Sequence, residues 1–240
     1  VAVQIQKLSE LGVQFDGLNV TGMISNVTGL NQALAQLQIL NNLGFDLAGV
    51  TIDLSGIQTA GLSVAQINQI QIQLNQLAEA AVTLVLPGGT QVALNTGTSV
   101  SVNAQGVVTI TLASGISIVT QANGAVSVTL PNVTVPYQFD AGSIVTTTAE
   151  GNVVVTQNFL DTEGAEVRVT AVITVTGQTT LTYYNQQTGS SVVQLANNAV
   201  VSIVNGVTTV TYPASVEVLA ATQITVNTAG NIVVTRSGVE

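Results

Sequence analysis

Hydrophobic and polar positions alternate along residues 90–129: the hydrophobic ones are Val, Ile and Leu, and the polar ones are Thr, Ser, Asn and Gln. A period of two is expected of a β-strand with one buried face. Two breaks that contain Gly, residues 103–106 and 121–124, separate the apolar runs and suit hairpin loops in which Gly takes a left-handed conformation. The pattern predicts strands that bury Val100, Val102, Val108, Ile110, Leu112, Ile116, Ile118, Val126 and Val128.

Runs rich in Val, Ile and Thr continue from this stretch to the end of the chain. Many short strands joined by short turns predict a mainly β fold of the antiparallel β-sandwich or jelly-roll-like class. A β-solenoid is the alternative, and it would hold a fixed repeat period. The hairpin glycines Gly106, Gly124, Gly151 and Gly230 are unevenly spaced, and this favours the sandwich.

Two amphipathic helices are predicted in the N-terminal part of the chain. The first spans residues 31–43, with Asn31 as its N-cap and Gly44 at its end. The second spans residues 63–80 and has Ser63 as its cap. Their apolar stripes are formed by Leu34, Leu37 and Leu40 in the first helix and by Val64, Ile67, Ile70, Leu74 and Leu77 in the second.

The sequence Pro87-Gly88-Gly89 marks a break in the chain, because Pro and Gly together are typical of turns. Helical patterns end at this point and strand patterns follow it. We therefore expect a helix-containing N-terminal region, residues 1–86, and a β-sandwich-like domain, residues 87–240.

The first eight residues have a strand pattern of their own, in which Val1, Val3 and Ile5 alternate with Ala and Gln. A strand at a chain end can add to the exposed edge of a sheet. We expect this segment to pair with a sheet edge, either in its own subunit or in a neighbouring one.

Charged residues are scarce: they make up 6% of the 240 residues, against about 25% in average soluble proteins. The cations are Lys7, Arg168 and Arg236, and the formal net charge is −9. Nucleic-acid binding and attachment to anionic membranes both need clustered Lys and Arg, so these functions are excluded. A membrane-spanning helix is not expected either, because no run of about 18 apolar residues exists.

The reactive side chains also limit the chemistry, because the chain contains neither His nor Cys. Disulfides, thiolate metal sites and Ser-His-Asp triads are therefore absent, and we expect a protein that is not an enzyme. The densest charge cluster holds Asp161, Glu163 and Glu166, which are candidate ligands for Ca²⁺. A solvated hairpin tip beside Arg168 is the commoner interpretation, and no other cofactor is predicted.

Three Asn-x-Thr triplets begin at Asn19, Asn26 and Asn132. They accept glycans only where the source cell glycosylates exported proteins. The chain begins with Val rather than Met. We expect a mature extracellular chain whose signal peptide has been removed.

The low-charge composition, rich in Thr, Val and Asn, is similar to that of prokaryotic extracellular filament subunits and adhesins. Isolated β proteins defend sheet edges with Lys, Pro or charge, and this chain has one Lys and four Pro. The sequence predicts a structural subunit that assembles with copies of itself into a filament, pilus or surface layer, through strand edges and helix contacts. The alternative is an adhesin that recognises a glycan or a surface through a Thr-rich β face.

Overall fold

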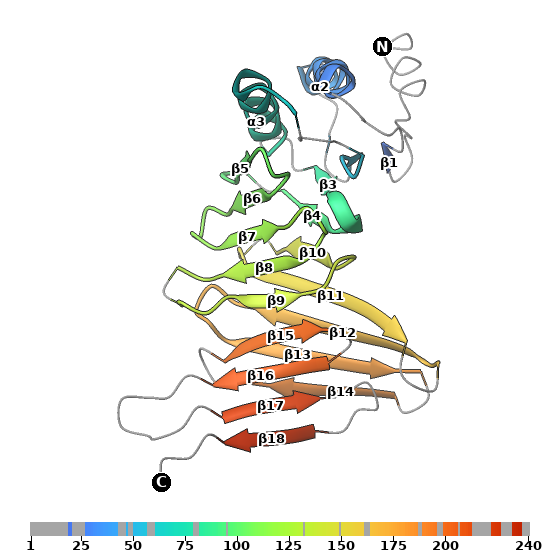
Figure 1. Cartoon of the computed structure of the whole chain (residues 1–240), viewed down its shortest axis with the longest axis vertical. Coiled ribbons are helices and arrows are strands. Elements are labelled where there is room, and N and C mark those ends of the chain that lie inside the picture. The colour runs from blue at the N-terminus through green and yellow to red at the C-terminus, as the bar shows by residue number, and fades with distance from the viewer. Residues whose placement is uncertain are drawn as a thin grey trace. The chain divides into compact units, whose positions relative to one another are not determined.

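The chain is mainly β, and its strands form two mixed sheets (Figure 1). It divides into two compact units, Val1–Gly124 and Ala125–Glu240. The computed structural model describes residues 19–20, 27–42, 47, 50–56, 61–78, 82–94, 96–131, 133–148, 150–160, 164–186, 189–195, 199–205, 207–212, 222–226 and 232–236.

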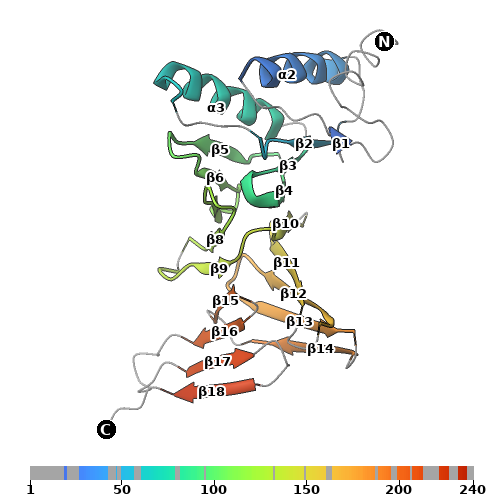
Figure 2. The same cartoon turned by 45° about the vertical axis from the view of Figure 1, so that its right-hand side comes forward.

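The first unit begins with a regular strand–helix arrangement. Three strands, β1 (Asn19–Val20), β2 (Thr51–Asp53) and β3 (Thr83–Val85), pair in parallel, and their first residues face one another across the ladder. The strands therefore recur every 32 residues along the chain. The connections contain α2 (Val27–Asn42) and α3 (Val64–Ala78), which pack against each other (Figure 2). The sequence patterns predicted the two helices but not this regular interval.

The helix α2 starts earlier than predicted. It begins at Val27, so Asn31 lies inside the helix and the assignment of Asn31 as N-cap is wrong. The reason is that the apolar stripe extends one turn further towards the N-terminus, to the fully buried Leu30. Gly44 and the side chain of Leu34 lie outside the described residues. The buried residues of α2 are Leu30, Ala33, Leu37 and Leu40.

The helix α3 begins with the predicted cap. The Gln66 N–H donates to Ser63 Oγ at 3.3 Å, and Gln66 Oε1 accepts from the Ser63 N–H at 2.9 Å. This reciprocal pair satisfies two amides that have no partner within the helix. Of the predicted stripe, Ile67, Ile70 and Leu74 are buried, but Val64 is 74% exposed. Val64 lies in the first turn, beyond the part of α3 that contacts the core, and the side chain of Leu77 is not described.

The predicted break at Pro87 is a turn between two strands, because α3 ends at Ala78 and β3 already precedes it. Residues Pro87–Gly89 form a short turn, η1, and β4 (Gln91–Ala93) then returns antiparallel to β3. This break falls inside the first compact unit, and the two domains expected on either side of it stay a prediction.

Three antiparallel strands complete the first unit: β5 (Ser99–Val102), β6 (Val108–Thr111) and β7 (Ser117–Thr120). Their hairpins close by one mechanism, seen at Asn103, whose C=O accepts from Gly106 N at 3.1 Å while its N–H donates to Val107 O. A Gly with positive φ is needed at the end of each such loop. The glycines in this conformation recur every nine residues, at Gly97, Gly106, Gly115 and Gly124.

The predicted alternation along residues 90–129 is confirmed. The nine apolar side chains expected in the core each expose 9% of their surface or less. Most of the hydroxyl-bearing residues between them, Ser101, Thr109, Thr111, Ser117 and Ser127, are less buried and point to the opposite face, as the pleat of a strand requires. Thr120 differs, because it continues the buried face of β7 and is 1% exposed.

The edge of β5 is closed by a side chain of α3. Asn75 Nδ2 donates to the Val100 carbonyl at 2.9 Å, and Asn75 Oδ1 accepts from the Val100 N–H at 2.7 Å. Asn75 Nδ2 also donates to the Gln71 carbonyl at 2.8 Å, which fixes the amide on the helix. The amide thus occupies the backbone groups of Val100 that an added strand would use.

We expect Asn75→Ala to lower the free energy of unfolding by about 1–2 kcal/mol. The substitution leaves two backbone groups of Val100 without partners, which costs about 1–3 kcal/mol, offset by roughly 0.5 kcal/mol of helix propensity. The matched control is Gln76→Ala, at an exposed neighbouring position on α3. Urea unfolding measures both, and equal stabilities of the two variants would contradict the assignment.

The second unit contains two groups of strands. The first is a continuous antiparallel series of β10 (Ile144–Thr147), β11 (Val153–Leu160), β12 (Glu166–Ile173), β13 (Thr179–Asn185) and β14 (Gly189–Gln194). The second group joins β9 to β15 in parallel, with antiparallel neighbours on either side. Its strands are β8 (Val126–Thr129), β9 (Tyr137–Phe139), β15 (Val200–Val204), β16 (Val207–Tyr212), β17 (Thr222–Val226) and β18 (Ile232–Arg236).

A buried tyrosine links these two groups of strands. Tyr137 on β9 is fully buried, and its hydroxyl donates to the Ala199 carbonyl at 2.9 Å. The same hydroxyl lies 3.1 Å from Oγ1 of Thr179 on β13. Burial raises the pKa of Tyr137, and the hydrogen bond with Thr179 opposes this shift. The phenol therefore belongs in the core as a neutral, hydrogen-bonded group.

Tyr137 should make stability fall at alkaline pH. Because its pKa is raised in the folded state, its contribution is complete below the unfolded pKa of about 10 and is lost as pH rises above that value. Tyr137→Phe should cost about 1–2 kcal/mol at neutral pH. We expect the difference in unfolding free energy between wild type and Tyr137→Phe, measured by denaturant titration, to be constant up to about pH 10 and to shrink above it. A difference that stays constant at higher pH would refute this account.

Candidate functional site

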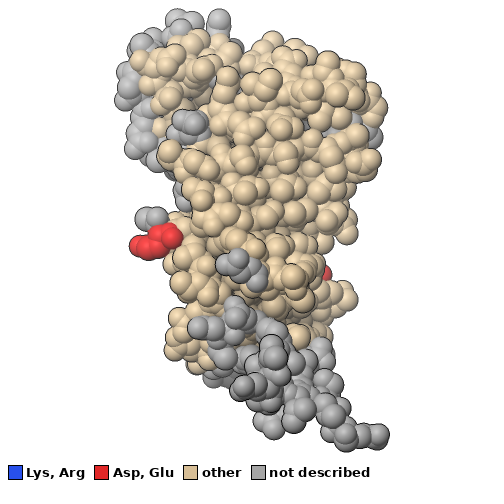
Figure 3. All heavy atoms as spheres, turned by 90° about the vertical axis from the view of Figure 1, so that its left-hand side faces the viewer, with Lys and Arg blue, Asp and Glu red and all other residues tan. Residues whose placement is uncertain are grey.

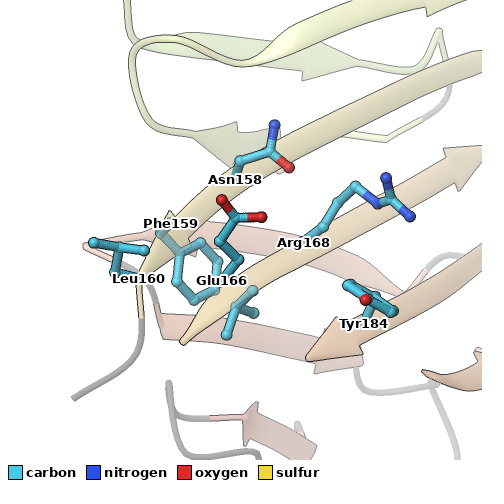
Figure 4. A pocket seen from close by; sticks show the side chains of 7 residues that line it. Asn158, Phe159, Leu160, Glu166, Arg168 and Tyr184 are labelled. Atoms are coloured by element: carbon cyan, nitrogen blue, oxygen red, sulfur yellow. The ribbon is translucent and has the colours of Figure 1, made fainter. Parts of the chain in front are cut away.

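An open hollow lies on the second unit, where β11, β12 and β13 run side by side (Figure 4). Its volume is about 450 Å³, which is within the range of small-molecule sites. The residues that line it are Asn158, Phe159, Leu160, Glu166, Val167, Arg168 and Tyr184.

The strand register brings the polar residues of the hollow together. Asn158 on β11 faces Arg168 on β12, and Arg168 in turn faces Tyr184 on β13. Glu166 lies two residues before Arg168, and therefore on the same face of the strand. Between them Val167 points the other way and is only 1% exposed. The alternation that places apolar side chains in the core thus also places these polar side chains together on the outer face of the sheet.

Arg168 is held by an aromatic ring rather than by an acid. Its guanidinium carbon lies 5.2 Å from the centre of the Tyr184 ring, a cation–π distance. Within the described part of the chain Arg168 forms no ion pair, and Figure 4 shows its side chain extending away from Glu166. Among the described residues, the N–H groups of Arg168 thus have no acidic partner.

Charge is sparse around the molecule, which makes this cation distinctive. On the face drawn in Figure 3, red acidic atoms appear in few places, and the described residues show no blue atoms. Arg168 is also the one Lys or Arg whose side-chain burial is described, because Lys7 and the side chain of Arg236 lie outside that part of the chain.

Of the three candidate calcium ligands, the structure describes Glu166, an exposed residue that opens β12 and lines the hollow. Asp161 and Glu163 lie outside the described residues. The described part of the chain contains no group of three or more acidic side chains that could hold a metal ion. Calcium binding by this cluster stays a prediction.

The remaining predicted sites fall mostly on segments that the structure does not describe. Of the three glycosylation candidates, Asn19 forms part of β1, whereas Asn26 and Asn132 lie outside the described residues. The same holds for the proposed assembly residues Val1, Val3 and Ile5.

A second candidate site is the outer edge of β14, the last strand in its sheet order. The Leu195 N–H donates to the Thr179 carbonyl at 2.8 Å, so the pair of Leu195 and Thr179 is hydrogen-bonded. Hydrogen-bonded pairs alternate along an antiparallel ladder. The backbone N–H and C=O groups that point away from β13 are therefore those of Ser190, Val192 and Gln194.

Comparison with known proteins gives no relationship: no family model, no curated protein and no solved structure matches the chain. Among the described residues, neither helix is both long enough and apolar enough to cross a membrane.

Sequence analysis placed Arg168 near a hairpin tip but did not find its contact with Tyr184. The two residues are 16 positions apart, and only the register of the β12–β13 hairpin shows that they are opposite each other. The sequence signal that could have shown this is the tight turn of residues 174–178, centred on Thr176, from which the pairing can be counted outwards.

Arg168→Gln should leave the stability of the protein nearly unchanged. Exposed cation–π pairs contribute about 0.5–1 kcal/mol, so we expect a loss of less than about 1 kcal/mol in urea unfolding. The neighbouring buried Val167→Ala is the control and should cost about 2 kcal/mol, because it leaves a cavity in the core. A loss from Arg168→Gln as large as that from the control would make Arg168 a structural residue.

Proposed function

We propose that this protein is an exported structural subunit that assembles with copies of itself into an extracellular filament, pilus or surface layer. The observation that carries the proposal is the outer edge of β14. Ser190, Val192 and Gln194 turn their backbone donors and acceptors outwards there. An unpaired edge of this kind is a template for a strand from another molecule.

The edge of β14 lacks the usual protection against pairing. The strand GSSVVQ contains no Lys, no Pro and no charged residue, and Val192 at its centre is 66% exposed. The edge of β5 is different, because Asn75 occupies the outward backbone groups of Val100. Among the described residues, the edge of β5 thus has a partner at Val100 and the edge of β14 has none, and this contrast supports directed association at β14.

Growth of a filament requires that the strand added to β14 come from a different part of the neighbouring copy than its own β14. Two copies of β14 paired with each other would close a dimer, whereas a filament needs two different surfaces in each contact. Residues 1–8 supply a second surface, because Val1, Val3 and Ile5 alternate in the pattern of a strand. We propose that this segment is donated to β14 of the next copy.

Helix contacts form the second part of the proposed interface. On α3, Val64 is 74% exposed and Ile72 is 61% exposed, in a helix whose remaining surface is mostly Gln and Asn. Burying these two side chains against a neighbour would remove apolar surface from water without desolvating charge.

The arrangement of the two groups of strands in the second unit is also a proposal. We propose that the β part is a sandwich, with the two groups of strands in the second unit as its layers. The buried hydrogen bond between Tyr137 and Thr179 supports this, because it joins β9 of one group to β13 of the other.

Val192→Lys should block assembly. A lysine at the centre of the open edge must be desolvated when a strand is added, and natural proteins use it there to prevent pairing. We expect ordered filaments or lattices of wild type in negative-stain microscopy at neutral pH. For Val192→Lys the protein concentration needed for assembly should rise by at least about tenfold, which corresponds to about 1.4 kcal/mol per contact.

The matched control is Val192→Thr, which keeps a β-branched residue without charge and should assemble like wild type. Wild type that stays monomeric at high concentration would overturn the proposal. Assembly that persists after deletion of residues 1–8 would reject strand donation and leave the open edge as the interface.

A surface-binding module is the second candidate function, and a row of threonines favours it. Thr156, Thr170 and Thr182 face one another on three neighbouring strands, and the hydroxyls of Thr156 and Thr170 are 3.1 Å apart. The row lies on the same outer face as Arg168. Binding to a glycan array by a protein that forms no polymer would favour this function over assembly.

A further inference from the structure

We propose that the hollow of β11, β12 and β13 binds an acidic saccharide, with its carboxylate on Arg168 and its hydroxyls on Asn158 and Glu166. This inference rests on the second function above, recognition of a glycan or surface, and names the class of ligand. It is independent of strand addition at β14.

Arg168 provides the acidic selectivity. A guanidinium presents its N–H groups as a planar fork that fits the two oxygens of a carboxylate. The contact with the Tyr184 ring, at 5.2 Å, orients this fork before a ligand arrives. Less side-chain freedom is then lost on binding, which favours affinity.

Glu166 determines which anions fit. It lines the same hollow as Arg168, so a compact anion such as phosphate or sulfate would meet a negative charge within the site. A sugar acid avoids this, because its charge is at one position and its hydroxyls are at others. Its hydroxyls can donate to the Glu166 carboxylate, and the Asn158 amide can both donate and accept.

The remaining walls suit the C–H face of a sugar ring. Leu160 is 63% exposed although it is a large apolar residue, and it faces Glu166 across the β11–β12 ladder, on the same side of the sheet as Arg168 (Figure 4). A volume of about 450 Å³ is within the range of about 300–1,000 Å³ that small-ligand sites span. The net charge of −9 disfavours non-specific binding of polyanions, so recognition depends on this local cation.

The test is a calorimetric titration of the full chain with a hexuronate oligosaccharide. Its matched ligand is the same oligosaccharide with the carboxylates reduced to alcohols. Where wild type assembles, both titrations use the Val192→Lys protein. We expect the reduced oligosaccharide to bind the protein at least about tenfold more weakly than the acidic one does. The acidic oligosaccharide should bind Arg168→Gln at least about tenfold more weakly than it binds the protein with Arg168. Arg168→Lys should give an intermediate loss, because it keeps the charge without the fork.

The variant Glu166→Gln distinguishes binding of a sugar acid from binding of a simple anion. This variant should bind the oligosaccharide several-fold more weakly and inorganic phosphate more tightly than wild type does. Glu150→Gln, an exposed acid outside the hollow, is the control and should change neither. Urea unfolding of each variant checks that the fold is intact.

Equal binding of the acidic and reduced oligosaccharides, unaffected by Arg168→Gln, would overturn the inference while glycan recognition stands. Phosphate binding as tight as that of the oligosaccharide would also overturn it. Absence of binding to either oligosaccharide, together with a blank glycan array, would remove the second function itself.

Discussion

Most strands whose side-chain burial the structure describes bury alternate side chains, and both the hollow and the open strand edge depend on this period of two. Val167 turns inwards to the core, and its neighbours Glu166 and Arg168 therefore turn outwards into one hollow. The same alternation directs the backbone of β14 in turn towards β13 and towards solvent. Most polar positions hold Thr, Ser, Asn or Gln rather than charged residues. Like charges therefore rarely face one another across neighbouring strands.

The edges of β5 and β14 differ in whether their backbone hydrogen-bonding groups have partners. Asn75 supplies β5 with one donor and one acceptor from a side chain, in the geometry that a further strand would use. The edge of β14 has no such partner among the described residues. A hydrogen-bonding surface that is closed at one place and open at another suits addition at a defined position rather than general aggregation.

Much of the local structure could be predicted from the sequence, because neighbouring residues decide it. The alternation, the capping pair of Ser63 and Gln66 and the break at Pro87 all follow from spacing alone. The start of α2 and the exposure of Val64 could not be predicted, because they depend on where the helix meets the core.

The sites were harder to predict than the elements. The pairing of Arg168 with Tyr184 depends on hairpin register. The 32-residue interval of β1, β2 and β3 was visible in the similar strings that begin at Val50 and Val82, but two copies are a weak signal of a repeat.

The glycines at nine-residue intervals have a consequence for how this fold can change length. One interval contains one strand and one turn, so each added interval widens the sheet by a single strand. Consecutive strands of a meander run in opposite directions, and a single interval would therefore reverse the direction of all that follows. Insertions and deletions that preserve the downstream fold should occur in pairs of intervals, which makes the hairpin rather than the strand the unit by which this sheet grows or shrinks.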